Sequence, residues 1–422
     1  MKKAALHNLG CKVNAYETEA MQQMLEEAGY EIVPFHEKAD IYIVNTCSVT
    51  NIADRKSRQM LHRAKKLNPD SIVIAAGCYV QTSGEKAAQD DRIDILIGNN
   101  RKKDLLRLIR EYQQQHRVQD GCIDINDGKQ EYEELHLKRT GEHTRAFLKV
   151  QDGCNQFCSY CIIPYARGRG RSRQIRDVEA EARELAEGGY QEIVLTGIHL
   201  SSYGLDHGES LLELIQRLHE IPGIHRIRLG SLEPGIITET FARELSKLPK
   251  VCPHFHLSLQ SGSASVLKRM NRRYTPEEYR EKCEIIRKVF EHPAITTDII
   301  VGFPGETEEE FEETMAFVQD IHFYEIHVFK YSKRQGTKAA VMPDQVPEKV
   351  KNERSARLME AAEEMKNEFI SWYHGKKVSV LFEEGEEIDG IRHMKGFTPE
   401  YVKVSIPTEE NLENKIMEVE FS

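Results

Sequence analysis

The sequence predicts an α/β protein in three parts: a parallel α/β domain, an incomplete (β/α)6 barrel and a small C-terminal β domain. Short apolar runs alternate with helical stretches over the first hundred residues, and again, with longer units, from Arg145 to Ser332. After Gly375 the pattern changes to short strands only. The first domain is predicted at residues 1–120, and a polar linker follows at 121–140. The barrel with its trailing helix is predicted at 141–374, and the β domain at 375–422.

The N-terminal strands are predicted at Ala4–Leu9, Ile41–Asn45 and Ile72–Ala76, with helices at Tyr16–Gly29 and Ile52–Leu67. Loops at the carboxyl ends of parallel strands converge on one edge of a sheet, where ligands bind. Three thiols from three such loops can therefore hold a metal cluster with one open iron; the alternative is three small buried cysteines. The thiols are those of Cys11, Cys47 and Cys78, one after each apolar run.

The central strands indicate six βα units, and sites in such barrels lie on the carboxyl-terminal face. Among the helices between them, Asp177 is a plausible N-cap, Pro276 takes a first helical position, and Thr307 with Glu310 forms a capping box. The predicted strands are Ala146–Val150, Glu192–Thr196, Arg226–Gly230, His254–Leu259, Thr296–Val301 and Tyr324–Tyr331.

A second cysteine group, Cys154, Cys158 and Cys161, follows the first central strand in the spacing Cys-x3-Cys-x2-Cys. A zinc site usually needs four ligands. Thiolates this closely spaced instead suit a 4Fe-4S cluster held by three of its four irons, with the fourth left open. The alternatives are a zinc knuckle or a chance grouping.

Residues 345–374 read as one long helix, and strands are predicted at Val378–Phe382, Tyr401–Ser405 and Ile416–Phe421. From His374 onward there are six basic and eleven acidic residues, so the predicted β domain is acidic.

The composition excludes several classes of function. A net charge of −10 excludes a globally basic nucleic-acid binder, although local basic patches remain possible. No apolar run approaches the ~18 residues of a membrane span, and the N-terminus lacks a secretory apolar segment. The nine cysteines cluster as metal ligands and not as a disulfide framework, so we expect a cytoplasmic protein with no membrane contact.

Longer motifs resemble the radical S-adenosylmethionine methylthiotransferases over nearly the whole chain. The motifs are LGCKVNAYETE, VNTCSVTNIADRKSRQ and AAGCYVQ, then DGCNQFCSYCIIPYARGRGRSR, LTGIHLSSYG, RLGSLEP, HLSLQSGSASVLKRMNRRYT and TDIIVGFPGETEEEFEET. The C-terminal strands occupy the place of that family's small RNA-binding TRAM barrel. An excess of acidic residues is unusual for such a barrel, and its candidates for stacking on or contacting RNA are Tyr401, Phe397 and Arg392. Within the family, the Gly-Cys-Lys-Val-Asn motif and the Arg-Gly-Arg-Gly-Arg-Ser-Arg run resemble the branch that acts on N6-threonylcarbamoyladenosine in tRNA.

This resemblance implies two 4Fe-4S clusters and S-adenosylmethionine as cofactors. The cluster on Cys154, Cys158 and Cys161 would cleave S-adenosylmethionine to a 5′-deoxyadenosyl radical that removes hydrogen from adenine C2. The cluster on the other three cysteines would supply the sulfur. Further cofactor contacts are expected at Tyr160, Gly197, Glu233, Gln260 and Asp298, with helix capping as the alternative for the strand-end polar residues.

The expected partners are tRNA and an electron donor of the flavodoxin or ferredoxin type, while the sulfur donor is not indicated. RNA contact is predicted for two acid-free basic runs next to the cysteines; their members are Arg167, Arg169, Arg171 and Arg173, and Arg55 and Lys56. The alternatives are a sibling enzyme for isopentenyladenosine tRNA or a ribosomal protein, a radical methylase without sulfur insertion, and a non-catalytic iron–sulfur RNA-binding protein.

Overall fold

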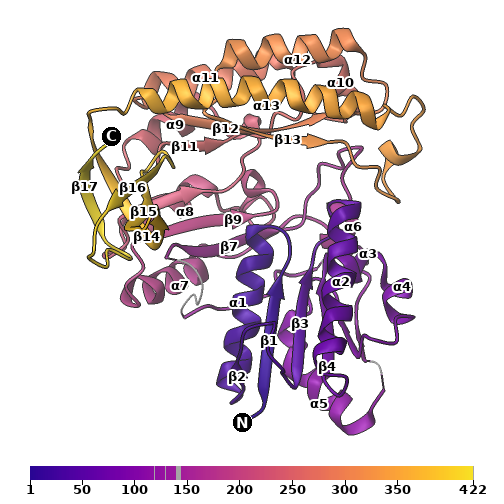
Figure 1. Cartoon of the computed structure of the whole chain (residues 1–422). Helices are drawn as coiled ribbons and strands as arrows, with labels where there is room; N and C mark the ends of the chain where they lie inside the picture. Colours follow the sequence, from indigo (N-terminus) through magenta and orange to yellow (C-terminus); the bar gives the residue numbers. More distant parts are fainter. Residues whose placement is uncertain (118, 129, 139–143, 422) are drawn as a thin grey trace.

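The computed structural model describes residues 1–117, 119–128, 130–138 and 144–421. The N-terminal α/β unit (indigo to purple in Figure 1) lies below the central strands and helices, and the C-terminal strands (yellow) lie to one side. No helix of the described residues is long and apolar enough to span a membrane.

The N-terminal unit is a six-stranded parallel sheet in the order β2-β1-β3-β4-β5-β6. The three predicted strands are confirmed as β1, β3 and β4. The other three were missed because each has only two or three residues, too few for a periodic pattern. The bounds are β1 Lys3–Asn8, β2 Glu31–Ile32, β3 Ile41–Thr46, β4 Ile72–Gly77, β5 Ile95–Ile97 and β6 Gln119–Gly121.

Helices cover both faces of this sheet (Figure 1). Met21 and Leu25 of α1 pack with α5 on one face, and Leu61 and Ala64 of α2 pack with α3 and α4 on the other. Thr50 caps α2 by accepting a hydrogen bond from the Ala53 N–H. The bounds are α1 Lys12–Glu27, α2 Asn51–Leu67, α3 Cys78–Thr82, α4 Gly84–Ala88 and α5 Leu105–Gln115.

The central unit contains the six predicted strands, which lie in two sheets. β10, β9 and β7 are parallel, with β8 antiparallel at the edge, while β11, β12 and β13 form a second parallel sheet. Isolated bridges, including Leu232 to Leu257, join the two into one incomplete barrel wall. The bounds are β7 Ala146–Asp152, β8 Arg171–Ser172, β9 Glu192–Gly197, β10 Arg226–Leu229, β11 His254–His256, β12 Ala294–Val301 and β13 Glu325–Lys330.

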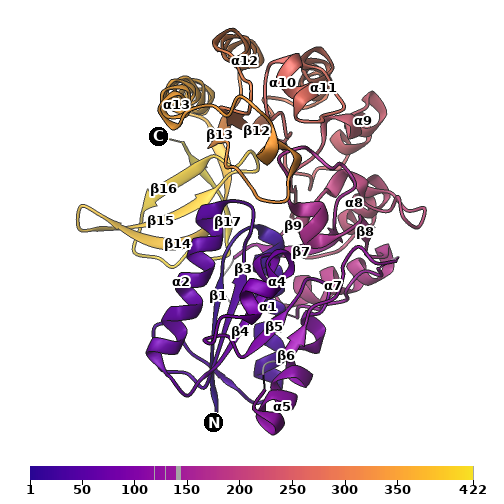
Figure 2. The same cartoon turned by 90° about the vertical axis from the view of Figure 1, so that its right-hand side faces the viewer.

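Helices follow these strands and lie in an arc outside them (Figure 2), where their apolar faces form one continuous core with the outward-facing strand residues. The helices of the central unit are α6 Ile163–Arg167, α7 Ile175–Glu187, α8 Leu211–His219, α9 Glu239–Ser246, α10 Ala264–Arg269, α11 Pro276–Val289, α12 Glu308–Ile321 and α13 Glu348–Ser371. The short helix α6 is not part of this arc and lies beside α3 of the N-terminal unit (Figure 1). Single 3-10 turns occur at Lys102–Asp104, Leu200–Ser202, Pro234–Ile236 and Lys338–Val341.

Two of the predicted helix starts are confirmed, with capping boxes at Thr275 and Thr307. The third prediction is wrong, because α7 begins earlier and Gln174 takes the N-cap position. Asp177 lies within the first turn instead, where its negative charge still favours the positive end of the helix dipole.

The C-terminal strands form an antiparallel sheet in the order β16-β15-β14-β17. This sheet packs on the amino ends of the central strands, since Arg226 at the start of β10 donates to the Ser379 and Phe397 carbonyl oxygens. It therefore lies at the end of the barrel opposite the Cys154–Cys161 loop. The bounds are β14 Lys377–Ile388, β15 Ile391–Phe397, β16 Lys403–Pro407 and β17 Ile416–Glu420.

Candidate active site and metal centres

The first cysteine group lies at the carboxyl edge of the N-terminal sheet. Cys11 precedes α1 as its N-cap, Cys47 follows β3, and Cys78 begins α3 directly after β4. Burial raises the pKa of the Cys47 thiol to about 11, and the neighbouring Cys78 and Cys11 thiols add to the effect. The three sulfur atoms are thus close enough to influence one another, as the strand-end pattern predicted.

Two glycines allow this arrangement. Gly10 has a φ of +113°, and a Cβ there would lie 3.1 Å from Cys47 Sγ. Gly77 has a φ of +94°, and a Cβ there would lie 2.6 Å from Asn45 Oδ1. Larger residues at these positions would be strained and would push against the cysteine loops.

The second cysteine group lies in the loop after β7, on the carboxyl face of the barrel. Cys154 Sγ accepts a hydrogen bond from the Gln156 N–H at 3.4 Å, and Cys158 Sγ accepts one from Arg272 Nη1 at 3.3 Å. Burial raises the pKa of Cys154 to about 11 and that of Cys161 to about 12, with the Cys158 thiol as a further cause in both.

The spacing of the sulfur atoms separates two kinds of metal site. Within the described part of the chain, neither cysteine group brings its three sulfur atoms within 4.8 Å of one another. A single zinc ion with Zn–S bonds of about 2.3 Å requires sulfur atoms about 3.8 Å apart. The wider grouping suits a multi-iron cluster, so the residues fit the two predicted 4Fe-4S centres better than single-ion sites.

A buried ionic network connects the two units beside these cysteines. Arg167 is 0 % exposed and donates to Asn14 Oδ1 at 2.6 Å, to Glu17 at 2.9 Å and to Asp152 at 3.1 Å. Lys149 of β7 also pairs with Glu17 at 2.7 Å. Helix α1 of the N-terminal unit is therefore held against the inner face of β7 by paired charges.

These contacts contradict the RNA-binding prediction for three arginines. Arg167, Arg171 and Arg173 are buried and paired, Arg171 with Asp152 at 3.2 Å and Arg173 with Glu181. A buried, neutralised guanidinium cannot reach a phosphate. The acid partners were not visible in the sequence, because they come from other segments.

The remaining basic candidates are exposed. Arg169 lies over the Phe157 ring at 4.5 Å, and Arg55 and Lys56 lie on the outer face of α2. RNA contact therefore stays a prediction for these three residues.

In contrast, Tyr401 and Phe397 stack on each other at 4.5 Å and against Arg145, so both rings are used in packing the C-terminal sheet onto the barrel.

Three of the predicted cofactor contacts share one pocket of about 280 Å³. Tyr160, Gln260 and Asp298 line it together with Cys161, and its opposite wall is Val49 and Thr50, just after Cys47. The pocket thus opens beside one cysteine of the barrel group and is bounded by the loop of the N-terminal group. Burial raises the pKa of Tyr160 well above its usual value, so its hydroxyl stays neutral.

The other two predicted contacts lie elsewhere. Glu233 accepts a hydrogen bond from Arg272 at 2.9 Å, and that arginine also donates to Cys158. Gly197 lies against Gln151, where a Cβ would meet the Gln151 Cβ at 2.9 Å. Close packing against Gln151 is therefore a sufficient reason for glycine at position 197. Glu233 is linked to the cysteine loop by Arg272, which donates to both the Glu233 carboxylate and Cys158 Sγ.

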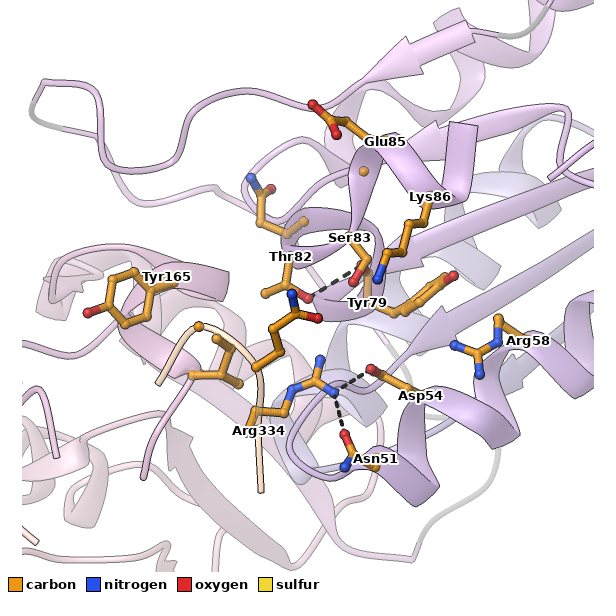
Figure 3. A pocket seen from close by; sticks show the side chains of 15 residues that line it. Asn51, Asp54, Arg58, Tyr79, Thr82, Ser83, Glu85, Lys86, Tyr165 and Arg334 are labelled. Atoms are coloured by element: carbon orange, nitrogen blue, oxygen red, sulfur yellow. Dashed lines mark hydrogen bonds and ion pairs between the residues drawn. The ribbon is translucent and has the colours of Figure 1, made fainter. Parts of the chain in front are cut away.

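A larger pocket, of about 660 Å³, lies where the two units meet (Figure 3). Tyr79 and Thr82 of α3 line it from the N-terminal side, and Tyr165 and Arg334 line it from the barrel side. Arg334 donates to Ser48 Oγ at 2.6 Å and pairs with Asp54. The loop after β13 is thereby tied to the segment after Cys47.

Sequence reasoning missed four polar residues around the cysteines. Asn14 lies beside Cys11 and Arg167. Asn99 Nδ2 donates to Cys78 Sγ at 3.4 Å and to the Ala166 carbonyl oxygen at 2.7 Å. The other two are Arg272 and Arg334, whose contacts are given above. Only Asn14 had a signal, its place in the Gly-Cys-Lys-Val-Asn motif.

The barrel is incomplete, and its cysteine loop faces a second cysteine group. This arrangement is that of a radical S-adenosylmethionine enzyme with an added cluster domain. The radical SAM superfamily model matches residues 148–318, and that of uncharacterized protein family UPF0004 matches residues 3–98. Solved structures agree in fold: the radical S-adenosylmethionine methyltransferase TsrM from Kitasatospora setae aligns with a TM-score of 0.60 at 16 % identity, over 81 % of this chain and 74 % of that one.

Relatives of known function show which family of radical S-adenosylmethionine enzymes the chain resembles in sequence. The chain is 43 % identical to the threonylcarbamoyladenosine tRNA methylthiotransferase MtaB of Bacillus subtilis, over 99 % of this chain and 93 % of the relative. It is 41 % identical to a tRNA-2-methylthio-N(6)-dimethylallyladenosine synthase of Thermoanaerobacter sp., over 90 % of this chain and 81 % of the relative. The protein belongs to the radical S-adenosylmethionine methylthiotransferase family, whose members use S-adenosylmethionine and two 4Fe-4S clusters.

Proposed function

We propose that the protein is a tRNA methylthiotransferase that converts N6-threonylcarbamoyladenosine, 3′ of the anticodon, into its 2-methylthio derivative. The observation that carries this proposal is the pocket that has Cys161 on one side and the segment after Cys47 on the other. An adenine held there would be within reach of both cysteine groups. The relatives named for threonylcarbamoyladenosine span the chain at 36–43 % identity and support the choice of nucleoside.

When bound, the cluster on Cys154, Cys158 and Cys161 would supply one-electron cleavage of S-adenosylmethionine, and the cluster on Cys11, Cys47 and Cys78 would supply sulfur. The chain's own residues position and shield these events. Arg272 holds the Cys158 sulfur and the Glu233 carboxylate in one place. Tyr160 and Ile300 give the 280 Å³ pocket an apolar wall that would exclude water from a reactive intermediate.

The substrate class makes tRNA the macromolecular partner, with a cytoplasmic site of action. Exposed Arg55, Lys56 and Arg169 are the basic groups placed to contact its phosphates. A small reductase of the flavodoxin or ferredoxin type would supply the electrons.

The test is an anaerobic reaction of the reconstituted protein with reductant, S-adenosylmethionine and tRNA lacking the methylthio group, followed by mass spectrometry of the nucleosides. We expect a methylthio gain on threonylcarbamoyladenosine. A gain on isopentenyladenosine alone would contradict the substrate and place the protein with its sibling relatives. Release of 5′-deoxyadenosine without any modified nucleoside would contradict tRNA as the substrate.

Two cysteine variants test which cysteine group cleaves S-adenosylmethionine and which supplies sulfur. Cys158→Ala should abolish 5′-deoxyadenosine and product alike, whereas Cys47→Ala should remove product and leave some 5′-deoxyadenosine. Full methylthio product from Cys47→Ala would show that the N-terminal cysteines do not hold the sulfur-donating centre. Cys283→Ala is the matched control, since Cys283 is buried in the outer core of the barrel.

A further inference from the structure

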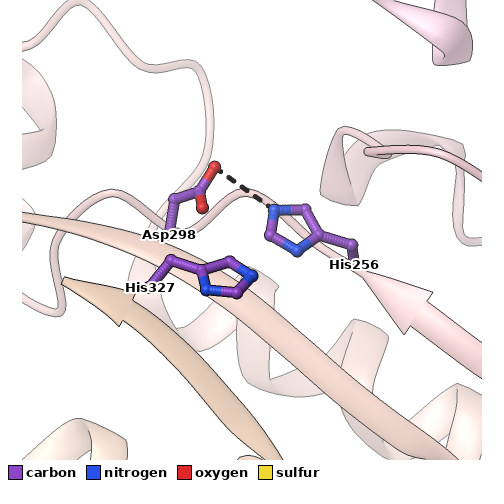
Figure 4. Close-up of side chains that lie close together, drawn as sticks. All are labelled: His256, Asp298 and His327. Atoms are coloured by element: carbon purple, nitrogen blue, oxygen red, sulfur yellow. Dashed lines mark ion pairs between the residues drawn. The ribbon is translucent and has the colours of Figure 1, made fainter. Parts of the chain in front are cut away.

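Three side chains outside both cysteine groups converge on the inner face of the barrel wall. His256 comes from β11, Asp298 from β12 and His327 from β13, and Figure 4 shows the three pointing toward one another. One ligand atom from each lies within 4.8 Å of the others, and they are the one such histidine, cysteine and carboxylate group found in the described ranges.

The strand register fixes this convergence. Asp298 is the direct neighbour of His327 in the β12–β13 ladder, and His256 pairs with Thr296, two residues before Asp298 on the same face of β12. Since all three side chains project from adjacent strands of one sheet, their separation is set by backbone hydrogen bonds and not by a flexible loop.

The first two ligands have the separation that a metal ion requires. His256 Nε2 lies 3.2 Å from Asp298 Oδ2. Two donors that bind one ion with bonds of about 2.1 Å stand roughly 3.0–3.4 Å apart in octahedral or tetrahedral geometry. The His256 and His327 rings are stacked with centroids 5.7 Å apart, and one ring nitrogen of His327 lies within 4.8 Å of the other two ligand atoms.

His256 also has the support typical of a metal ligand. Its Nδ1 lies 3.0 Å from Thr296 Oγ1. A ligating histidine usually gives its second ring nitrogen to such a partner, which fixes the ring orientation and leaves Nε2 free to bind the ion.

The Asp298 carboxylate has one protein partner, the His256 ring. Across the described residues, Asp298 has no lysine or arginine partner, and His327 makes no hydrogen bond or ion pair. Asp298 is only 28 % exposed at its side chain. This half-buried carboxylate therefore has no partner with a permanent positive charge.

We propose that His256, Asp298 and His327 form a binding site for one divalent metal ion. Two imidazoles and one carboxylate are the donor set of Mn²⁺, Fe²⁺, Co²⁺, Ni²⁺ or Zn²⁺ sites, and such a set leaves further coordination positions open. Asp298 also lines the 280 Å³ pocket, so the site adjoins the space beside Cys161. There the ion would bind a carboxylate, phosphate or hydroxyl oxygen of a small molecule.

The test uses Mn²⁺, which prefers nitrogen and oxygen ligands to thiolates, so it does not compete for the cysteines. The protein, loaded with its clusters and oxidised so that they give no electron paramagnetic resonance signal, is titrated with Mn²⁺ without tRNA or S-adenosylmethionine. The fall of the free Mn²⁺ signal gives the affinity and the number of sites. We expect one site in the wild-type protein and at least a tenfold weaker affinity in His327→Ala and in Asp298→Asn.

His322→Ala is the matched control, because His322 is an exposed histidine that pairs with Glu368 at the end of α12. It should bind Mn²⁺ like the wild type. Equal iron content in every variant shows that each is folded and loaded. The proposal is overturned if His327→Ala binds Mn²⁺ as tightly as the wild type, or if the wild type binds no Mn²⁺ and no Co²⁺. Neither result depends on which nucleoside the enzyme modifies.

Discussion

At the scale of single residues, the most consequential group is the Glu17 carboxylate, which joins the two halves of the active region. Burial alone would raise its pKa, but Arg167, Lys102 and Lys149 surround it and hold the pKa well below the usual value. A buried carboxylate with three cationic neighbours stabilises the contact only as long as it stays ionised.

Glu17→Gln should therefore destabilise the protein, because it leaves the three cations with one fewer anion in a buried site. We expect a loss of about 3–5 kcal/mol in the free energy of unfolding at pH 7, measured by chemical denaturation. Glu27→Gln, an exposed carboxylate of the same helix that pairs with Lys138, should change the stability little. Equal stability of the two variants would contradict this role for Glu17.

The same carboxylate predicts a pH dependence. Because the folded pKa of Glu17 lies below its unfolded value of about 4.3, its contribution is complete above that value and is lost as the pH falls through the folded pKa. The stability difference between the wild type and Glu17→Gln should thus be constant from pH 6 to 8 and shrink below about pH 4.3. A difference that grows on acidification would reverse the assigned sign.

At the scale of elements, the turns after the strands determine where the thiols meet. Gly10 and Gly77 let the chain turn from strand to helix directly at a cysteine, in a backbone conformation that other residues rarely adopt. A side chain at Gly10 would also enter the space of Cys47 Sγ.

Gly10→Ala should weaken the N-terminal centre and spare the one in the barrel. After anaerobic reconstitution we expect about four iron atoms per chain instead of about eight, measured by iron analysis. Gly29→Ala is the control, since Gly29 has a similar positive φ but no atom within 4 Å of its added Cβ. About eight iron atoms in Gly10→Ala would contradict this role, and an equal loss of iron in both variants would assign the effect to backbone strain and not to the contact with Cys47.

Helix α2, which follows Cys47, presents the exposed basic side chains of Arg55 and Lys56. Arg55→Ala with Lys56→Ala should weaken tRNA binding and lower the slope of log affinity against log salt concentration by about 1–2, because each phosphate contact releases counterions. Filter binding at several salt concentrations measures the slope. The double variant Arg243→Ala, Lys247→Ala removes two exposed charges from α9 and should leave the slope unchanged. An unaltered slope in the α2 variant would exclude it from the RNA interface.

At the scale of the whole molecule, Arg334 links the barrel to the N-terminal unit across their shared pocket (Figure 3). Arg334→Ala should let the two units move apart. We expect 5′-deoxyadenosine to form at a similar rate, while the methylthio product per 5′-deoxyadenosine falls at least tenfold. Chromatography of both products from one reaction gives this ratio. Lys333→Ala, an exposed neighbour in the same loop, should keep the wild-type ratio; a normal ratio in Arg334→Ala would contradict the linking role.

The position of the C-terminal sheet is also a property of the whole molecule. It covers the amino ends of the barrel strands through Arg226, Arg228 and Tyr401, at the end away from the Cys154–Cys161 loop. Its aromatic residues Phe397 and Tyr401 pack on arginines of the barrel. Any contact that this sheet makes with RNA would therefore lie at the end of the barrel away from the Cys154–Cys161 loop.

Local sequence patterns were enough to predict the longer strands, the main helices and the two cysteine groups. Periodicity and ligand spacing are local properties, so Cys154, Cys158 and Cys161 and the strand-end cysteines could be recognised without coordinates. Gln260 and Asp298 were candidates because polar residues at the carboxyl ends of barrel strands face the site, whereas Tyr160 was expected from the family resemblance.

The roles of the charged residues could be assigned only from the folded structure. Arg167, Arg171 and Arg173 appear in the sequence as a basic run, yet their acid partners Glu17, Asp152 and Glu181 come from distant segments and are brought together by folding. The same holds for His256, Asp298 and His327, which lie on three strands separated by helices. Charge acts between neighbours in space, and a linear sequence does not specify those neighbours.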